Sequence, residues 1–240
     1  MFAKEKDELS RLQYVSSYVA VGVSGFIVLI PLAHRLGVVP LGMAFVCFAI
    51  GVVVGLVSAL VIGVSLIRNG VKSFATMALV IVGCVVAVPL MSILAAVGAP
   101  AIHDITTDVS DPPQFIEAVQ HVTPGRTDYG GDELANQQRE AYPDIVPIMV
   151  AESPDVAFSL ALEVARDLGW EVINANAGER RIEATDTTWW FGFVDDIVIR
   201  IRREETGSRI DVRSLSRVGV GDLGANAARI RRFRDALNVG

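Results

Sequence analysis

Three long runs of uncharged, mostly apolar residues dominate the first hundred positions and limit what this chain can fold into. They cover about residues 14–33, 38–67 and 74–97 and contain no Asp, Glu, Lys or Arg. An α-helix needs roughly 20 such residues to cross a hydrocarbon core of about 30 Å. A mean hydropathy of +0.46 over the chain is also rare for a soluble protein. We therefore predict three transmembrane helices behind a short N-terminal segment, residues 1–13.

Basic residues beside the runs predict the orientation, because Lys and Arg of short flanking segments stay in the cytoplasm. One side carries Lys4, Lys6, Arg11, Arg68 and Lys72, and the other carries only Arg35. The first run is longer than the apolar core of a signal peptide and lacks a small-residue cleavage site, so we expect a retained anchor. These features predict a cytoplasmic N-terminus and, in a bacterium, an inner-membrane protein with a periplasmic C-terminal domain.

The predicted spans carry small residues instead of ionisable ones. Ion and proton pathways usually place ionisable groups inside the helix bundle, so the sequence disfavours a transporter or pump. Gly51, Gly55, Ala59 and Gly63 recur at every fourth position and predict one helix face suited to close packing. This face either packs against the other spans of the chain or holds a homo-oligomer or an envelope protein partner.

The residues after Pro100 have a composition typical of a water-exposed domain. They include 15 Arg, no Lys and 24 acidic residues, a net charge of about −9. Such a charge argues against nucleic acid as a partner. Both cysteines, Cys47 and Cys84, lie in the apolar runs, so this half offers neither a disulfide nor a thiolate nucleophile.

Turn residues and periodicity divide the water-exposed half into two parts. Residues 101–143 are expected to form an extended segment and a loop, in which Asp111 caps a helix opened by Pro112 and Pro113. Residues 144–240 are expected to form an α+β domain. It has a helix from Ser153 to about Leu168 with an apolar face of Val156, Leu160, Val164 and Leu168, and a last helix over about 222–237. Four strands are predicted between them, at about 170–174, 181–187, 194–203 and 209–216.

Short turns between these strands favour an antiparallel four-stranded meander with helices packed on one face. Pairing across the turn at 204–207 places Ile199 opposite Val212 and Ile201 opposite Ile210 on the core face. Arg200 then faces Asp211 on the other face, with Arg213 and Asp196 near. We interpret these charges as a solvated ladder of cross-strand ion pairs.

The water-exposed half offers little for catalysis or metal binding. Asp104, Asp108 and Asp111 lack the spacing of a calcium loop, and one nearby histidine is too few for zinc. With only His103 and His121, no Cys and no G-x-S-x-G motif, the sequence also lacks a nucleophile and base at a recognisable spacing. We therefore expect no metal, no cofactor and no catalytic residues, which disfavours an enzyme.

One glycine motif near the C-terminus resembles the turn of a dinucleotide-binding fold. Residues 219–224 read GVGDLG. A Rossmann unit needs a further parallel strand and an acidic residue about 20 positions on, and only 16 residues follow Gly224. We expect no dinucleotide and interpret the motif as a tight strand-to-helix turn.

Several stretches together resemble the uncharacterised family called domain of unknown function 1499, over about residues 101–238. They read IHDITTDVSDPPQF, LGWEVI, RIEATDTTWWFGFVDDIVIRI and IDVRSLSRVGVGDLGANAARIRRF. The resemblance leaves the three apolar runs outside. It is compatible with placement at a membrane and implies no activity and no catalytic residues.

Two hypotheses for a site follow from the loops of the domain. Arg213 and Arg217 flank the turn at Gly219 and Gly221, where unpaired helix amides could bind an anion such as a phosphate or a lipid headgroup. Alternatively, Asp222 caps these amides and pairs with one of the arginines. Trp189 and Trp190 lie in an aromatic loop suited to a membrane interface, unless the loop at 123–143 covers them.

Three functions are compatible with these observations. The first is a structural or assembly role in the cell envelope, and the second is a binding module for an anionic ligand. A hydrolase is the third and has the least support in the sequence.

Overall fold

The computed structural model describes residues 2–95, 97 and 99–237. The third predicted run includes residue 96, and the predicted domain ends at residue 240; both positions lie outside the described residues. Two compact units divide the chain. One contains residues 1–95 and Trp189–Gly192, and the other contains residues 96–188 and 193–240.

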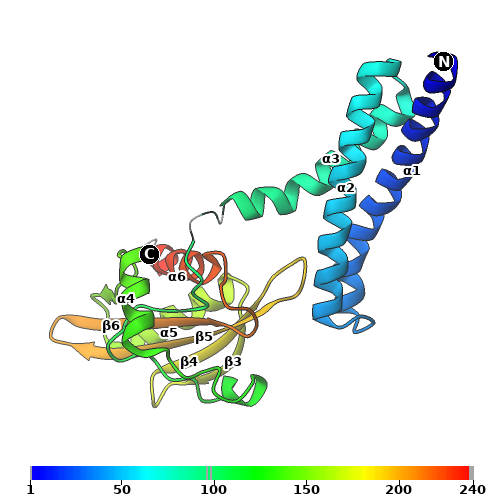
Figure 1. Cartoon of the computed structure of the whole chain (residues 1–240). Coiled ribbons are helices and arrows are strands. Elements are labelled where there is room, and N and C mark those ends of the chain that lie inside the picture. The colour runs from blue at the N-terminus through cyan, green and yellow to red at the C-terminus, as the bar shows by residue number, and fades with distance from the viewer. Residues whose placement is uncertain (1, 96, 98, 238–240) are drawn as a thin grey trace. The chain divides into compact units, whose positions relative to one another are not determined.

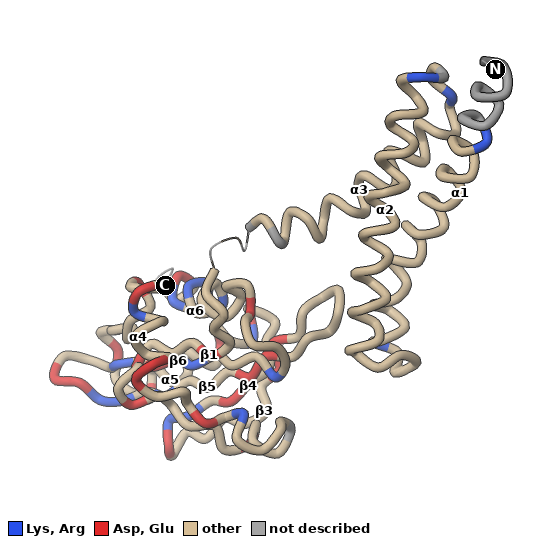
Figure 2. Tube along the Cα trace, in the orientation of Figure 1, with Lys and Arg blue, Asp and Glu red and all other residues tan. Residues whose placement is uncertain are grey.

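The first unit consists of three long helices, α1 (Phe2–Arg35), α2 (Leu41–Asn69) and α3 (Ser73–Ala95) (Figure 1). Within them, Arg11–Arg35, Leu41–Arg68 and Ser73–Ser92 are long and apolar enough to cross a membrane. Figure 2 shows the charged residues of these helices near their ends and a much denser distribution in the second unit. The prediction of three long apolar helices in this part of the chain is confirmed.

Two of the small residues in α2 lie against the other helices of the chain. A Cβ added at Gly51 would lie 3.0 Å from Ile27 of α1, and one at Gly55 would lie 3.0 Å from Val86 of α3. Glycine therefore allows α1 and α3 to approach α2 closely. Ala59 is half-buried, and a Cβ at Gly63 would meet nothing within 4 Å.

The second unit is built on a six-stranded antiparallel sheet. Its strands are β1 (Asp104–Thr106), β2 (Ile148–Val150), β3 (Glu171–Asn176), β4 (Arg181–Thr187), β5 (Val194–Glu204) and β6 (Gly207–Ser216). The order is β1-β6-β5-β4-β3, and β2 also pairs with β6. The predicted meander is present as β3 to β6, but the prediction of four strands was wrong, because β1 and β2 extend the sheet beyond β6.

The predicted register of the β5–β6 hairpin is confirmed. Ile199 pairs with Val212, Ile201 with Ile210 and Arg200 with Asp211. Alternating apolar and polar residues specify this register, because a slip by one residue would turn every core side chain to the opposite face.

Two helices cover the apolar face of the sheet. They are α5 (Pro154–Asp167), which begins after Ser153, and α6 (Ala225–Leu237). Their buried residues, among them Phe158 and Phe233, pack against isoleucines of β4, β5 and β6. The predicted apolar face of α5 was partly wrong. Ala157, Phe158, Ala161 and Ala165 are buried, whereas Val156 and Leu160 are 49% and 38% exposed.

The opposite face of the sheet is also covered. The predicted cross-strand ion pair of Arg200 and Asp211 forms, but the expectation that the charges on this face are solvated was wrong. Phe115 and Ala118 form a small core on it with Val198 and Leu215. Asp196, Asp211 and Arg213 are all 0% exposed. The segment that follows β1 contacts Arg213 through the Pro113 carbonyl and the Phe115 ring. Residues 108–120 gave no sequence signal that they fold back onto the sheet.

The segment from 101 to 143 has more structure than its polar composition indicated. It contains β1, a 3₁₀ turn η1 (Ala118–His121) and a helix α4 (Gly131–Ala141). The expected helix at Pro112 and Pro113 does not form, and Asp111 binds Arg200 and Arg202 instead. The side chain of Gln138 in α4 donates to the carbonyl of Thr106 and accepts from its amide, which closes the outer edge of β1.

Candidate functional site

Arg213, the first residue of the predicted anion site, lies in the interior of the domain. Its Nε and Nη2 donate to the two carboxylate oxygens of Asp104 at 2.9 and 2.7 Å. It also donates to the carbonyls of Pro113 and Thr127. The ring of Phe115 lies 4.9 Å from the guanidinium carbon. This guanidinium is enclosed by the domain and presents no open side to an external anion.

Arg217 is half-buried and has a similar partner. Its Nε and Nη2 donate to the carboxylate of Asp196 at 2.9 and 2.8 Å. Asp196 is 0% exposed, so the bidentate pair neutralises a carboxylate that would otherwise be buried alone. The two predicted arginines therefore bind two different aspartates.

The turn that contains Gly219 and Gly221 joins β6 to α6, as the sequence indicated. Asp222 accepts hydrogen bonds from the amides of Gly224 and Asn226 at 2.8 and 2.7 Å and so caps the first turn of α6. No hydrogen bond or ion pair described here joins Asp222 to Arg213 or Arg217. Asp222 therefore caps α6, as the alternative hypothesis predicted, but it does not pair with either arginine. Asp104 and Asp196 pair with the arginines instead.

A cavity of about 230 Å³ lies beside this turn. It is lined by Ala101, His103, Asp104, Asp128, Gly130, Leu134 and Val220. Burial, and then the charge of Arg126, lower the pKa of His103 below its ordinary value of 6.5, although Asp104 and Asp222 act in the opposite direction. His103 is therefore neutral at neutral pH. A proton acceptor is present, but the lining holds no Ser, Thr or Cys that could act as its nucleophile.

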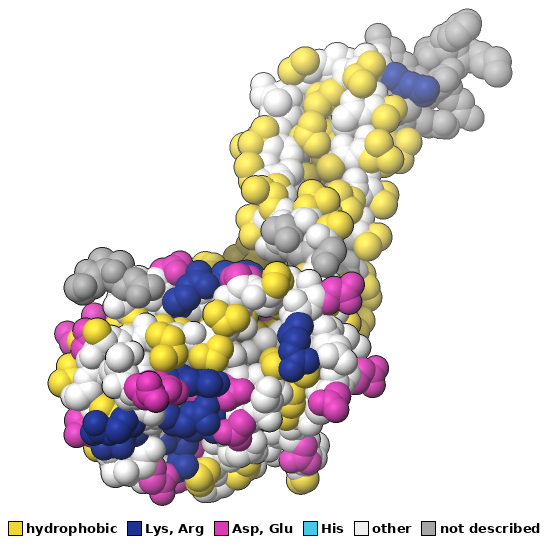
Figure 3. Space-filling model, turned by 90° about the vertical axis from the view of Figure 1, so that its left-hand side faces the viewer, with side chains coloured by type: hydrophobic (Ala, Val, Ile, Leu, Met, Phe, Trp, Pro, Cys, Tyr) yellow, Lys and Arg dark blue, Asp and Glu magenta, His cyan; other side chains and the backbone are white. Residues whose placement is uncertain are grey.

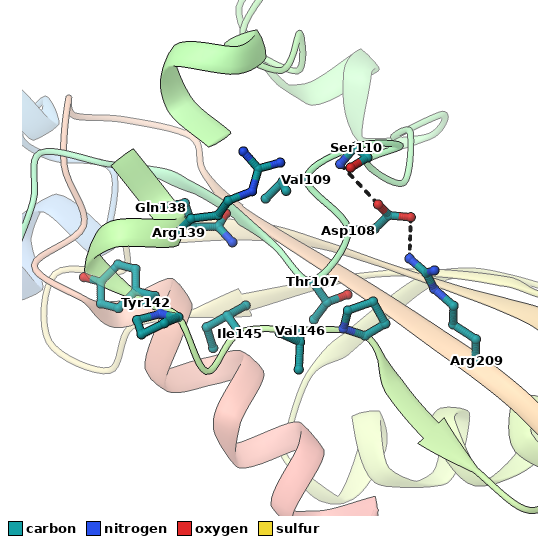
Figure 4. A pocket seen from close by; sticks show the side chains of 12 residues that line it. Thr107, Asp108, Val109, Ser110, Gln138, Arg139, Tyr142, Ile145, Val146 and Arg209 are labelled. Atoms are coloured by element: carbon teal, nitrogen blue, oxygen red, sulfur yellow. Dashed lines mark hydrogen bonds and ion pairs between the residues drawn. The ribbon is translucent and has the colours of Figure 1, made fainter. Parts of the chain in front are cut away.

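A second cavity of about 410 Å³ lies between the end of α4 and the segment after β1 (Figure 4). Arg139, Tyr142 and Val146 line one side, and Asp108 and Arg209 lie opposite. Burial raises the pKa of Tyr142 above its ordinary value, and its buried hydroxyl has no hydrogen-bond partner among the described residues. A phenol of raised pKa is a poor base at neutral pH.

Asp108 belongs to a cluster of three arginines and three aspartates on the face of the sheet opposite α5 and α6. The arginines are Arg200, Arg202 and Arg209, and the aspartates are Asp108, Asp111 and Asp211. Burial would raise the pKa of Asp108, but hydrogen bonds from the Asp111 and Ser110 amides and from Arg202, with the charge of Arg209, lower it overall. Figure 3 shows basic and acidic side chains beside one another on this unit. The cluster has no net charge, which leaves little attraction for an external anion.

The remaining predictions concern metals and the aromatic loop. The described residues include no group of three or more His, Cys, Asp or Glu side chains that could hold a metal ion. Asp104, Asp108 and Asp111 bind arginines instead. Trp189 is 88% exposed and Trp190 is half-buried.

Comparison with protein families places the second unit in a known family. Residues 104–237 match the family described as Protein of unknown function (DUF1499). This region covers more than half of the chain. The chain belongs to this family. The three apolar helices precede the matched region, and no curated protein matches the sequence.

Within the DUF1499 region, the sequence gave no indication of three buried polar residues that join distant segments. Glu183 of β4 accepts hydrogen bonds from the amides of Ile116, Glu117 and Ala118. Arg229 of α6 binds Asp186 and Asp195, and Gln138 pairs with Thr106. For Gln138 and Arg229 the available signal was a polar residue on the buried face that the helix period predicts. Glu183 alternates with the core residues Ile182 and Ala184 and therefore gave no such signal.

Proposed function

We propose that this chain is a membrane-anchored protein of the bacterial cell envelope with a structural or assembly role. The N-terminus would lie in the cytoplasm and the DUF1499 domain in the periplasm. The basic residues that flank the three apolar helices support this orientation. A C-terminal alkaline phosphatase fusion should be active and a C-terminal green fluorescent protein fusion dark; the reverse result would contradict the orientation.

One observation favours a structural role over anion binding. Arg213 and Arg217, the arginines expected to hold an anion, each form a bidentate pair with a carboxylate of the domain. A bound anion would have to displace Asp104 or Asp196 and leave that carboxylate buried without a partner. The geometry therefore supports a role for both arginines in stabilising the fold.

Thermal melting of the full chain in detergent separates the two functions. For the structural role, inorganic phosphate should leave the melting temperature unchanged, and Arg217→Ala should lower it by several degrees because Asp196 loses its partner. Arg203→Ala is the control, since Arg203 is exposed. If phosphate raises the melting temperature of the wild type but not of an Arg217→Ala variant with normal melting, the domain is an anion-binding module.

The assembly role includes a partner contact through α2, because Gly63 has open space beside it. Gly63→Leu should reduce the mass of the detergent-solubilised chain in light scattering if two copies pack there. Gly55→Leu should instead disturb the packing on Val86 within one chain. An unchanged monomer mass for the wild type and both variants would remove the homo-oligomer from the proposal.

We also propose that Trp189 and Trp190 contact the membrane interface. The 88% exposure of Trp189 supports it, since indole rings favour the headgroup region. Tryptophan fluorescence of the chain in nanodiscs should lose a blue-shifted component in the variant with Trp189→Ala and Trp190→Ala. An unchanged emission maximum would contradict it.

A further inference from the structure

The loop between β6 and α6, residues 217–224, displays apolar side chains that the domain does not bury. We call it the apolar loop. Val218, Val220 and Leu223 are 43%, 79% and 65% exposed. Three exposed apolar residues so close together contrast with the net charge of about −9 after Pro100. Such a cluster marks an interaction surface more often than scattered apolar residues do.

The backbone of Leu223 adds an independent observation. Its φ is +56°, in the left-handed region that glycine and asparagine adopt readily and leucine rarely adopts. This backbone conformation is unfavourable for leucine. Because the side chain is 65% exposed, burial within the domain offsets only a small part of its free-energy cost. The turn that Asp222 caps therefore holds an exposed apolar side chain at the surface of the domain.

The base of the apolar loop is fixed by hydrogen bonds. Arg126 donates to the carbonyls of Ser216 and Gly219 at 2.8 and 2.6 Å. The amide of Asp222 donates to the carbonyl of Ile102, and its carboxylate caps α6. The loop therefore holds its apolar side chains on an ordered frame, which reduces the entropy lost when they contact a partner.

The apolar loop leaves the sheet at the end where the chain arrives from α3. Ser216 at the end of β6 pairs with Asp195 near the start of β5. The amide of Ser216 also donates to the backbone carbonyl of His103, just before β1. The opposite end of the sheet carries the turn after Glu204 and the turn before Arg181, with exposed charged residues in both. The three exposed apolar residues thus lie at one end of the sheet, and both of these charged turns lie at the other.

A short stretch of chain joins the end of α3 to the residue beside the apolar loop. The six peptide units from Ala95, the last residue of α3, to Ala101 span at most about 20 Å when fully extended. Ala101 is in close contact with the apolar loop, since a Cβ added at Gly221 would lie 3.1 Å from the Cα of Ala101. The loop is therefore attached, through a short connection, to the helix proposed as the last membrane span.

We propose that the apolar loop is a membrane-interface contact, in which Val218, Val220 and Leu223 insert among the headgroups and upper acyl chains of a bilayer. This inference rests on the membrane anchoring in the proposed function and not on the structural role. The contact is apolar, because Arg217 is already paired with Asp196 and the domain is acidic. Insertion should therefore depend little on salt or on anionic lipid.

The test uses the full chain in phosphatidylcholine nanodiscs with brominated acyl chains. Cys47 and Cys84 are changed to Ala, and a bimane probe is attached to a single new cysteine. Val220→Cys reports on the loop, Leu60→Cys on the exposed surface of α2, and Thr206→Cys on the charged end of the sheet. We expect bromine to quench the probes at 60 and 220, and aqueous iodide to quench only the probe at 206.

The controls separate the inference from membrane anchoring. Quenching by bromine at 60, with iodide quenching at 220, would overturn the loop contact and leave the anchoring intact. Protection from both quenchers at 220 would indicate a protein contact and also overturn it. No bromine quenching at 60 would overturn the anchoring and the inference together.

A second variant removes the apolar side chain without straining the fold. Asparagine tolerates a positive φ better than leucine, so Leu223→Asn should leave the melting temperature unchanged or raise it. It should also lower bromine quenching at 220 by about twofold or more, because less apolar area enters the bilayer. Unchanged quenching in this variant would contradict a role for Leu223 in insertion.

Discussion

At the scale of single residues, Arg213 shows how the domain uses charge inside its core. Its side chain is 0% exposed, and Asp104 is 1% exposed. Two carboxylate oxygens, two backbone carbonyls and the rings of Phe115 and Tyr129 surround the guanidinium. Burial and the charge of Asp104 raise the pKa of Tyr129 to about 12, so this ring stays neutral.

We predict that Arg213→Met lowers the free energy of unfolding by about 3–5 kcal/mol, because Asp104 then stays buried without a cation. Urea unfolding of the chain in detergent measures this loss. Arg232→Ala should change it by less than about 0.5 kcal/mol, since its side chain is 62% exposed and 3.9 Å from Asp186. Adding Asp104→Leu to Arg213→Met should recover part of the loss; a double variant less stable than either single one would contradict the account.

The lowered pKa of His103 predicts that the stability of the domain depends on pH. Burial and Arg126 lower its pKa in the folded domain below 6.5, while Asp104 and Asp222 oppose them. As the pH falls through about 6.5, the unfolded chain binds the proton first, so stability falls until the pH passes the folded pKa. His103→Gln should flatten this part of the stability curve relative to the wild type. Parallel curves between about pH 7 and 5 would show that His103 does not titrate as described.

At the scale of elements, β2 depends on one glycine of its neighbour. Gly207 begins β6 with a φ of +103°, and a Cβ there would lie 2.1 Å from the carbonyl oxygen of Val150. A side chain would therefore force β2 away from β6, the strand with which it pairs.

We expect Gly207→Ala to lower the free energy of unfolding by about 2 kcal/mol or more, from backbone strain and the lost pairing. Gly178→Ala, in the turn before β4, is the matched control: a Cβ there would lie 3.4 Å from the Asn176 amide oxygen, an ordinary contact. Amide exchange should show early opening of Ile148–Val150 in Gly207→Ala. Equal stability of the two variants would contradict the close contact.

At the scale of the whole molecule, the two units differ in what holds them together. The three apolar helices satisfy their backbone hydrogen bonds within each helix, whereas the domain depends on burial from water. Urea weakens that burial and should act on the second unit first.

We therefore predict two separate transitions for the detergent-solubilised chain. Trp170 is 5% exposed and stacks on Phe233, so its fluorescence reports the domain once Trp189 and Trp190 are replaced by Phe. Circular dichroism at 222 nm should retain the signal of α1, α2 and α3 after this fluorescence change is complete. A single transition with both signals would mean that the units unfold together.

The sequence by itself determined the features that local pattern encodes. Uncharged runs of sufficient length predicted the three apolar helices, and the two-residue period with turn residues predicted β3 to β6 and the pairing of Ile199 with Val212. Ser153, Pro154 and Gly169 placed the ends of α5 within a residue or two.

Tertiary structure alone decided the features that join distant segments. β1 and β2 have three residues each, too few for a periodic signal, and they exist because β6 offers them hydrogen bonds. Arg213 and Asp104 lie 109 positions apart, so nothing near either residue indicated an ion pair instead of an anion site. Burial decided which charges are paired. A charge enclosed by the folded chain requires a partner of opposite charge, whereas a charge exposed to water does not.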